Sequence, residues 1–274
     1  MKVKMKINSQ LVEKTLVEFL KDEITKFGFK KGVLGLSGGL DSTVTAFLGT
    51  RALGKENLVA LVLPYKSSDP ENISDAVEIA NILGIKHYKI DITPQIDIYF
   101  KKNPTSDRLL IGNKIARERM SVIFDYSARE KAMVIGASNK TELLLGYGTW
   151  YGDLASSVNP LGDLYKTQVF ELARHLGVPE KIIKKTPTAD LWPGQTDEEE
   201  MGLKYEITDK ILYMFFDQRK SKENVIKAGF DEKVVDKILT LVKKYQFKRT
   251  LPIIPKLSHR TIGKDFLYPR DWGV

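Results

Sequence analysis

A segment rich in glycine and hydroxyl side chains, LGLSGGLDST at Leu34–Thr43, is suited to bind an anion. Its three glycines let the backbone come close to a ligand, and its serine and threonine hydroxyls can donate hydrogen bonds. A helix that we expect from Leu40 to Ala52 directs its N-terminal N–H groups, and the positive end of its dipole, at the same place. We therefore predict that this segment holds a phosphate or pyrophosphate group.

Asp41 lies inside this segment. A carboxylate beside phosphates repels them unless a cation lies between the two, so we expect Mg²⁺ at Asp41. The segment is not a Walker A loop, because it lacks the GxxxxGK[ST] spacing and its lysine. The alternative is a plain turn from strand to helix, with Asp41 as a capping residue. A position directly after an expected strand and before an expected helix favours phosphate binding.

The elements that must position these residues follow from the hydrophobic pattern. Short apolar runs predict buried strands at 33–36, 58–63, 87–92 and 132–137. Helical periodicity predicts helices at 11–24, 40–52, 70–83, 113–130, 164–176, 198–218, 222–228 and 232–244. Alternation of this kind implies an α/β fold with a doubly wound, Rossmann-like parallel sheet and helices on both faces. Ligands of such sheets bind at the carboxyl ends of the strands, where the glycine-rich segment lies.

The length of 274 residues suits a single domain over 1–274, with the sheet at about 30–180. A helical part is expected at about 195–250 and a loop-like tail at 251–274. The net charge of +8 favours anionic partners, although mild basicity can serve solubility alone. The absence of cysteine excludes disulfides, thiolate metal sites and cysteine nucleophiles. No apolar run is long enough for a membrane span and no signal peptide is evident, so we expect a cytoplasmic protein without a membrane partner.

The segment SGGLDST resembles the signature of the ATP pyrophosphatases, the PP-loop family with the adenine nucleotide alpha hydrolase type of fold. Four later segments narrow the resemblance to the ammonia-dependent NAD synthetases. They are NKIARERM at 113–120, GASNKTE at 136–142, YGDLASSVNPLGDLYKT at 151–167 and PTADLWPGQTDEEE at 187–200. The similarity runs from about residue 10 into the tail.

The resemblance implies a ligase that amidates deamido-NAD to NAD with ammonia and ATP, through an adenylate, releasing AMP and pyrophosphate. It also implies that Asp41 and Glu142 bind Mg²⁺, and that Asp41 and Lys166 act in catalysis, Lys166 by neutralising the ATP phosphates. The ATP-binding residues implied are Gly35, Leu36, Ser37, Gly38, Gly39, Leu40, Asp41, Ser42, Ala137, Lys166 and Thr188. Those implied for deamido-NAD are Arg117, Trp150, Ser157, Ser258 and His259.

This chain departs from the common family pattern at several of these positions. Many members have threonine at Ala137, lysine at Trp150 and aspartate at Ser157, and they have His-Lys-Arg where this chain reads Ser258-His259-Arg260. Two charged contacts to the dinucleotide are therefore missing or replaced. Trp150 can stack on a base or on the pyridine ring, whereas an aromatic residue beside a tyrosine more often packs within the protein.

Arg117 and Arg119 lie two residues apart on an expected helix, so they do not share a face. We expect one of them to bind an anion and the other to pair structurally. By its place in the motif, Arg117 corresponds to the arginine that binds deamido-NAD.

Related two-domain enzymes obtain ammonia by hydrolysing glutamine with a cysteine on an extra domain. This chain has no cysteine, so we expect free ammonia, or ammonia from a separate protein, as the nitrogen source. The resemblance further implies a homodimer. One alternative is a tRNA-modifying PP-loop enzyme such as a lysidine synthetase, which the basic charge would suit. Another is a nucleotide-binding module without catalysis. No arginine-rich recognition helix is evident, so we expect no nucleic-acid partner.

Overall fold

The four expected strands form one parallel sheet in the order β3-β2-β1-β4 in this computed structural model, which describes residues 3–250, 252–259 and 261. Val33 in β1 pairs with Val59 on one side and with Val134 on the other. The strands are β1 (Lys31–Gly35), β2 (Leu58–Val62), β3 (Lys86–Lys89) and β4 (Ala132–Val134). Because the chain passes from β1 outward to β3 and then returns to place β4 on the far side of β1, the strand order reverses between β1 and β4.

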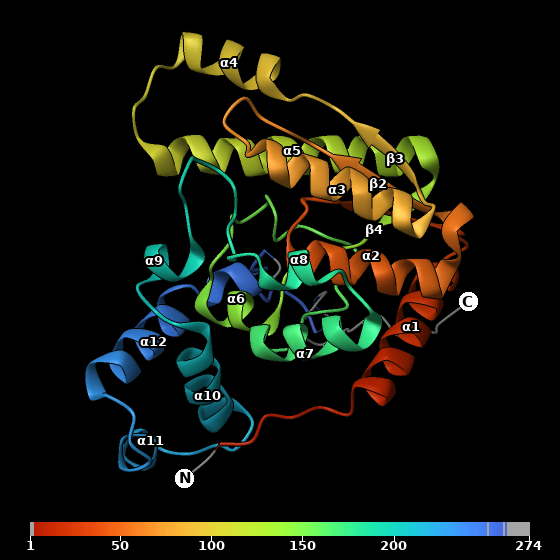
Figure 1. The fold of residues 1–274 in the computed structure, drawn as a ribbon. Coiled ribbons are helices and arrows are strands. Elements are labelled where there is room, and N and C mark those ends of the chain that lie inside the picture. Colours follow the sequence, from red (N-terminus) through yellow and green to blue (C-terminus); the bar gives the residue numbers. More distant parts are fainter. Residues whose placement is uncertain (1–2, 251, 260, 262–274) are drawn as a thin grey trace.

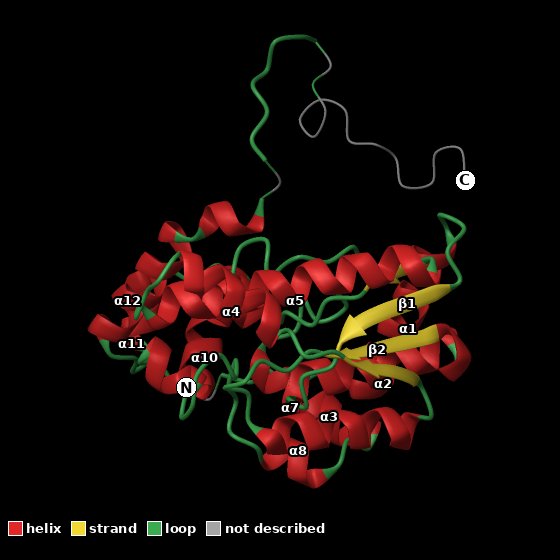
Figure 2. Ribbon diagram, turned by 90° about the horizontal axis from the view of Figure 1, so that it is seen from above, coloured by secondary structure: helices red, strands yellow, loops and turns green. Residues whose placement is uncertain are grey.

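Helices cover both faces of the sheet, as a doubly wound fold requires (Figures 1 and 2). Leu34 of β1 and Ala60 of β2 face an apolar cluster that includes the first group of helices. That group is α1 (Ser9–Thr25), α2 (Leu40–Leu53), α3 (Pro70–Leu83), α7 (Lys166–Leu176) and α8 (Glu180–Lys184). Val33 and Val59 face the opposite cluster, which α4 (Thr93–Lys102) and α5 (Arg108–Glu130) cover. Neighbouring residues of one strand therefore enter different cores, as the pleat dictates.

The remaining helices do not cover the sheet. They pack around a third apolar cluster, which contains Ile211, Leu212 and Ile238. These helices are α6 (Lys140–Leu145), α9 (Asp197–Met201), α10 (Tyr205–Phe216), α11 (Lys222–Lys227) and α12 (Glu232–Lys244). Short 3₁₀ helices lie at Lys55–Asn57 and Gln246–Arg249. The expected helical C-terminal part is confirmed. Among the described residues, no helix is both long and apolar enough to cross a membrane.

Several element boundaries differ from the predicted ones. The stretch 93–112 was expected to be a loop, but it contains α4 and the first residues of α5. Pro94 fits the first turn of α4, whose N–H groups need no helical partner, and Asp107 caps α5 by accepting from Leu109 N at 2.8 Å. The single helix expected at 198–218 is two helices, because Gly202 ends α9 in the left-handed region with φ +58°.

Candidate active site

The loops that follow β1 and β4 lie side by side at the point where the strand order reverses. A cavity of about 790 Å³ opens there, and both loops line it together with residues from 185–201. Reversal points of this kind are where doubly wound sheets bind ligands. The fold therefore brings the glycine-rich segment to the expected place.

The loop at 36–39 is held in shape by close packing and by its own hydroxyls. Gly38 has φ +78°, and a Cβ on it would lie 2.2 Å from the carbonyl oxygen of Asn72 in α3, so glycine is required there. The Ser42 hydroxyl accepts from Ser37 N at 3.2 Å, and the Thr43 hydroxyl donates to Gly39 O at 2.8 Å. The loop leads directly into the N-terminus of α2. It thus presents backbone and hydroxyl donors at a helix N-terminus, which suits an anion.

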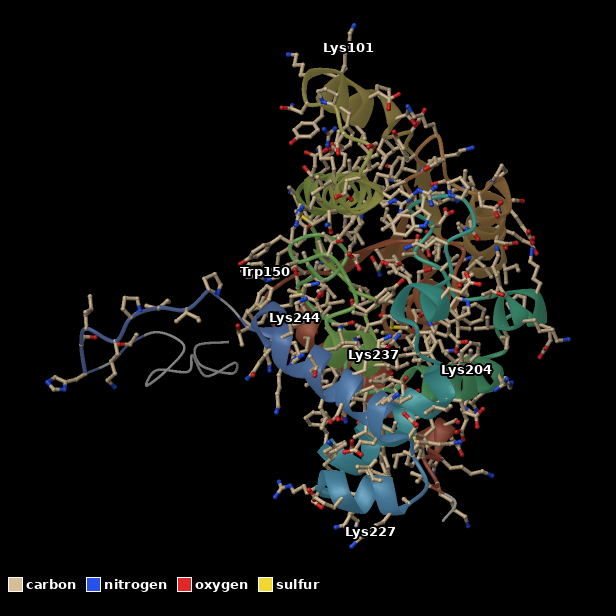
Figure 3. The ribbon with its side chains drawn as sticks, turned by 90° about the vertical axis from the view of Figure 1, so that its left-hand side faces the viewer. Lys101, Trp150, Lys204, Lys227, Lys237 and Lys244 are labelled. Carbon is tan, nitrogen blue, oxygen red and sulfur yellow. The ribbon has the colours of Figure 1, made fainter. Side chains whose placement is uncertain are left out.

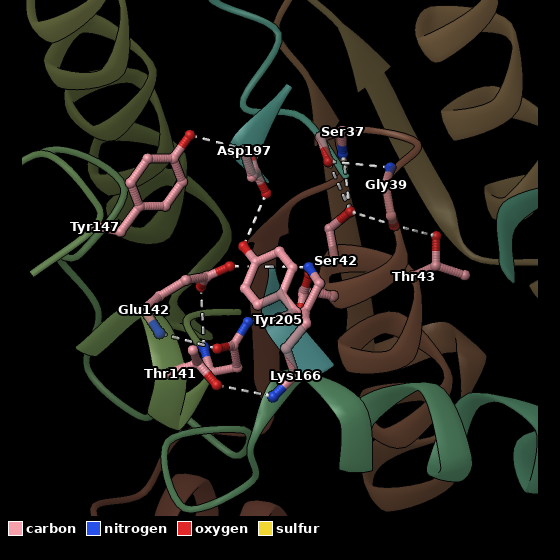
Figure 4. A network of polar contacts seen from close by, with 12 residues as sticks. Ser37, Gly39, Ser42, Thr43, Thr141, Glu142, Tyr147, Lys166, Asp197 and Tyr205 are labelled. Carbon is pink, nitrogen blue, oxygen red and sulfur yellow. Dashed lines mark hydrogen bonds and ion pairs between the residues drawn. The ribbon is translucent and has the colours of Figure 1, made fainter. Parts of the chain in front are cut away.

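Asp41, Glu142 and Lys166 meet beside this loop from three different helices. Glu142 and Lys166 are labelled in Figure 4. The Lys166 ammonium forms an ion pair with Asp41 Oδ2 and lies 3.9 Å from Glu142 Oε1. Its side chain is 3% exposed, whereas those of Asp41 and Glu142 are 17% and 16% exposed. One buried cation is therefore shared by two carboxylates, and the group carries a net charge of −1.

Burial and neighbouring charges both shift the pKa values of Glu142 and Lys166. Burial raises the pKa of Glu142 well above its ordinary value, and the nearby Asp41 carboxylate raises it further. Burial alone would lower the pKa of Lys166, but the charges of Asp41 and Glu142 outweigh it and raise that pKa. Lys166 is therefore firmly protonated near neutral pH.

Three polar residues that the sequence did not single out support this group. Asn139 donates from Nδ2 to Asp41 Oδ1 at 3.0 Å, and its backbone N–H donates to Glu142 Oε2 at 3.1 Å. Buried Asp209 of α10 accepts from the Thr141 hydroxyl at 2.6 Å and from Thr167 N at 2.8 Å. These contacts fix the starts of α6 and α7, which carry Glu142 and Lys166.

A third carboxylate, Asp197 at the start of α9, also lines the cavity. It accepts hydrogen bonds from the hydroxyls of Tyr147 and Tyr205, each at 3.0 Å (Figure 4). Burial raises the pKa of Asp197, and the Lys166 charge opposes that rise. In the sequence, Asp197 begins an acidic run at an expected helix start, where negative charge complements the helix dipole. That explanation suffices for the run, so the sequence did not indicate that Asp197 faces the cavity.

Most of the expected ATP-side residues line the cavity. They are Gly35, Leu36, Ser37, Gly39, Leu40, Asp41, Ser42, Ala137, Glu142, Lys166 and Thr188. Gly38 lies behind the loop against α3.

The expected deamido-NAD residues are not gathered there. Arg117 and Ser157 are exposed. Trp150 stacks on Tyr151 with ring centroids 4.6 Å apart and meets Phe247 edge-on at 5.2 Å (Figure 3). Ser258 and His259 are exposed in the segment 252–259, which runs away from the body (Figure 3), and Arg260 lies outside the described residues. Their roles stay predictions.

Lys248 does line the cavity, although the sequence did not single it out. Its ammonium donates to Gly146 O at 2.8 Å and to Gly148 O at 2.7 Å. Arg249 beside it donates to Leu143 O at 3.0 Å and to Leu144 O at 2.8 Å. This Lys-Arg pair therefore attaches the end of the chain's helical part to the loop after α6. A basic pair directly after the last amphipathic helix was the available signal.

Comparisons with known proteins show which family the chain resembles. A family model described as NAD synthase matches residues 12–252. The NH(3)-dependent NAD(+) synthetase of Trichlorobacter lovleyi is 51% identical over 270 residues, which covers 98% of this chain and 99% of that protein. The chain of Chlorobaculum tepidum with the same description is 50% identical over 262 residues, or 96% of this chain and 95% of that protein.

Solved structures are similar over nearly the whole chain. The structure of NMN synthetase from Francisella tularensis superposes with a TM-score of 0.81 at 33% identity, covering 92% of this chain and 100% of that one. The NH3-dependent NAD synthetase from Campylobacter jejuni gives a TM-score of 0.79, also at 33% identity, over 92% of this chain and 100% of that one. The chain belongs to the NAD synthase family.

Proposed function

We propose that this chain is a ligase that makes NAD⁺ from deamido-NAD⁺, ATP and ammonia. One observation carries the proposal: Asp41, Glu142 and Lys166 meet beside the 36–39 loop, in a chain half identical to NH(3)-dependent NAD(+) synthetases. A tRNA-modifying activity is not favoured, because the similarity to these synthetases covers 98% of the chain.

The reaction has two steps. An oxygen of the nicotinate carboxylate attacks the α-phosphorus of ATP, the bond to the β-phosphate breaks, and pyrophosphate leaves. Ammonia then attacks the activated carbonyl, loses a proton, and AMP leaves with the former carboxylate oxygen. Neither step needs a protein nucleophile, so the protein contributes mainly positioning and charge stabilisation.

Each group of the cavity has a definite task in this scheme. The loop at 36–39 and the N-terminus of α2 hold the pyrophosphate end of ATP. Lys166 offsets the negative charge that grows on the leaving pyrophosphate. Ala137 and Thr188 contact the remainder of ATP, and Arg117, Trp150, Ser157, Ser258 and His259 are the proposed contacts of deamido-NAD⁺.

The carboxylates of Asp41 and Glu142 fit a magnesium ion that arrives with ATP. Mg²⁺ is commonly bound through one or two carboxylates and completed by waters and substrate phosphates. Within the described residues, no group of three or more histidines, cysteines or acids could hold a metal alone, so the phosphates would complete the site. When bound there, the ion would withdraw charge from the phosphates and favour the departure of pyrophosphate.

A purified protein supplied with Mg-ATP, ammonium and deamido-NAD⁺ tests the proposal. NAD⁺ and AMP should form in equal amounts. Separate reactions replace ammonium by glutamine, or deamido-NAD⁺ by the nicotinate mononucleotide or by bulk tRNA. The mononucleotide is included because one structural relative is described as an NMN synthetase and because Trp150 and Ser157 carry no charge.

Absence of NAD⁺ from the complete mixture would contradict the proposal, and product with glutamine alone would contradict the use of ammonia. The homodimer, which the family resemblance implies, and the cytoplasmic location, which the sequence pattern favours, both stay predictions. Light scattering of the active protein tests the first.

The substitution Asp41→Ala tests whether this carboxylate contributes to catalysis. Loss of this carboxylate should lower kcat/KM about 100- to 1000-fold, the effect of removing one group that stabilises transition-state charge. Asp125→Ala is the matched control, because Asp125 is an exposed carboxylate on α5 that pairs only with Arg129. Steady-state AMP release measures both. Equal rates for Asp41→Ala and the wild type would refute the role of Asp41.

A further inference from the structure

Two arginines two residues apart on α5 have opposite surroundings. Arg117 is exposed, and its Nε donates to Trp150 O at 3.3 Å. Arg119 is half-buried and lines the cavity. Its Nε donates to Leu63 O at 3.1 Å, and one terminal nitrogen donates to the Ser68 hydroxyl at 3.2 Å. The cation that faces the nucleotide cavity is therefore Arg119.

Arg119 has no ion-pair partner in the part of the chain that the structure describes. Two other cations that line the cavity do have one: Lys166 pairs with Asp41, and Lys185 pairs with Asp75. Lys248 and the exposed Lys237 bond instead to backbone carbonyl oxygens. Burial lowers the pKa of Arg119, while Asp190 and Asp153 raise it from beyond ion-pair distance. A guanidinium nevertheless stays charged near neutral pH. Its two hydrogen bonds use two of five N–H donors, so donors are left for a ligand.

The guanidinium lies where the glycine-rich segment begins. Leu63, its backbone partner, directly follows β2, and Leu36 N donates to Leu61 O of β2 at 2.8 Å. Ile123, one turn further along α5, has its Cδ1 only 3.0 Å from where a Cβ of Gly35 would be. Arg119 therefore lies at the carboxyl ends of β1 and β2, beside the 36–39 loop.

We infer that Arg119 is a further substrate-binding residue, whose guanidinium takes an oxyanion of a bound nucleotide. An unpaired cation inside a cavity costs free energy unless an anion joins it. A guanidinium presents a planar fork of donors that matches the two oxygens of a carboxylate or a phosphate. The inference rests on the proposed function for the identity of the nucleotides. The anion belongs either to ATP or to deamido-NAD⁺, and binding measurements with each one separate them.

A structural role makes a different prediction. If Arg119 serves only to tie Leu63 and Ser68 together, Arg119→Met should lower the melting temperature of the free protein and leave nucleotide affinity unchanged. If Arg119 serves to bind an anion, the same variant removes a charge that no carboxylate compensates in the free protein, so its removal should cost little stability. The free protein should then melt close to the wild type, while one nucleotide binds more weakly.

The experiment measures melting temperatures of the free proteins and dissociation constants by calorimetry, without ammonia, for Mg-ATP alone and deamido-NAD⁺ alone. Arg119→Met should raise the dissociation constant of one nucleotide about 10- to 100-fold, the effect of losing a charged hydrogen bond. Arg119→Lys, which keeps the charge but not the fork, should lie between. Arg129→Met is the control, because Arg129 is an exposed arginine on the same helix.

Dissociation constants within twofold of the wild type for both nucleotides would overturn the inference. If Arg119→Met does not fold, Arg119→Lys decides: an unchanged affinity for both nucleotides overturns the inference, and a weaker affinity for one supports it. Because these measurements need no turnover, they are separate from the proposed function. The wild-type protein could make no NAD⁺ and still bind a nucleotide with an affinity that depends on Arg119. That result would contradict the proposed function and support Arg119 as a binding residue.

Discussion

At the scale of single residues, Lys166 holds the site together because two carboxylates share its ammonium. Its side chain is 3% exposed, so removing its charge leaves Asp41 and Glu142 facing each other. Breaking a buried pair in this way typically costs about 3–5 kcal/mol. We expect Lys166→Met to lower the free energy of unfolding by about 3 kcal/mol, as measured by urea denaturation.

The double variant Lys166→Met/Asp41→Asn should recover most of this loss, since it removes the repulsion, yet stay inactive. Lys210→Met is the control: Lys210 pairs with Glu206 on the surface of α10, and such pairs contribute about 0.2–1 kcal/mol. A single variant as stable as the wild type, or a double variant no more stable than the single one, would contradict the shared-cation interpretation.

The family resemblance implied roles for Asp41, Glu142 and Lys166 in one site, and the structure brings the three side chains together. It did not predict Asn139, Asp197 or Arg119. Asn139 and Asp41 are 98 residues apart, and their hydrogen bond exists only because β1 and β4 are neighbours in the sheet. Two arginines on one helix were recognised as facing apart, but periodicity alone did not say which of them faces the cavity. Such choices depend on tertiary packing.

At the scale of elements, Glu130 attaches the end of α5 to the amino ends of β1 and β3. It forms ion pairs with Lys31 at 3.1 Å and with Lys86 at 2.7 Å, and it accepts from the Tyr88 hydroxyl at 3.0 Å. Lys86 and Lys31 lower the pKa of Glu130 from 4.5 to about 2. A lowered pKa in the folded state stabilises the fold above the ordinary pKa, and this contribution is lost as the pH falls from about 4.5 towards 2.

Glu130→Gln should therefore reduce the free energy of unfolding by about 1–2 kcal/mol at pH 7, a value below the full linkage energy because solvent screens the lysines. Urea denaturation at pH 7, 5 and 3.5 measures the difference from the wild type. The difference should be constant from pH 7 to 5 and smaller at 3.5. A difference that grows on acidification would refute the ion-pair anchor. Asp125→Asn, at an exposed pair on the same helix, should show no such trend.

Elements were predictable where local chemistry fixes them. Asp69 caps α3 and Gly84 ends it with φ +64°, at the boundaries expected from the sequence. The parallel pairing of the strands was expected from their alternation with helices, whereas their order in the sheet comes from the structure. Helix α4 was missed because Pro94 and Pro104 flank a stretch with little apolar periodicity, although a proline in the first turn is compatible with a helix. Helix α6, Lys140–Leu145, is too short for periodicity to reveal, and its capping box at Asn139 and Glu142 is its local signal.

At the scale of the whole molecule, the net charge of +8 is not concentrated at the cavity. Exposed lysines such as Lys101, Lys204, Lys227 and Lys244 point outward from α4 and the C-terminal helices (Figure 3). Among the residues that the structure describes, six carboxylates and five cations line the cavity, which gives a formal charge of −1. They are Asp41, Glu142, Asp153, Asp190, Asp197 and Glu200, against Arg119, Lys166, Lys185, Lys237 and Lys248. The basic balance of the chain therefore does not by itself neutralise a bound nucleotide.

This distribution makes nucleotide binding depend on a divalent cation. A ligand at 100 times its dissociation constant stabilises the folded state by about 2.7 kcal/mol, which raises the melting temperature of a chain of this size by roughly 5–10 °C. We expect a rise of this order with Mg-ATP. ATP with excess chelator should give roughly a quarter of that rise or less, because the carboxylates of Asp41 and Glu142 then oppose the phosphates.

Asp41→Asn removes one of these charges and supplies the decisive comparison. In this variant, Mg-ATP should raise the melting temperature less than in the wild type, because the metal loses a ligand. Metal-free ATP should raise it more, because the phosphates lose a repelling neighbour. The difference between the two rises should therefore be smaller. Mg²⁺ alone serves as the control for direct effects of the ion on stability. Equal stabilisation of the wild type by ATP with and without Mg²⁺ would mean that Lys166, Arg119 and the 36–39 loop neutralise the phosphates unaided, and the metal role of Asp41 and Glu142 would have to be abandoned.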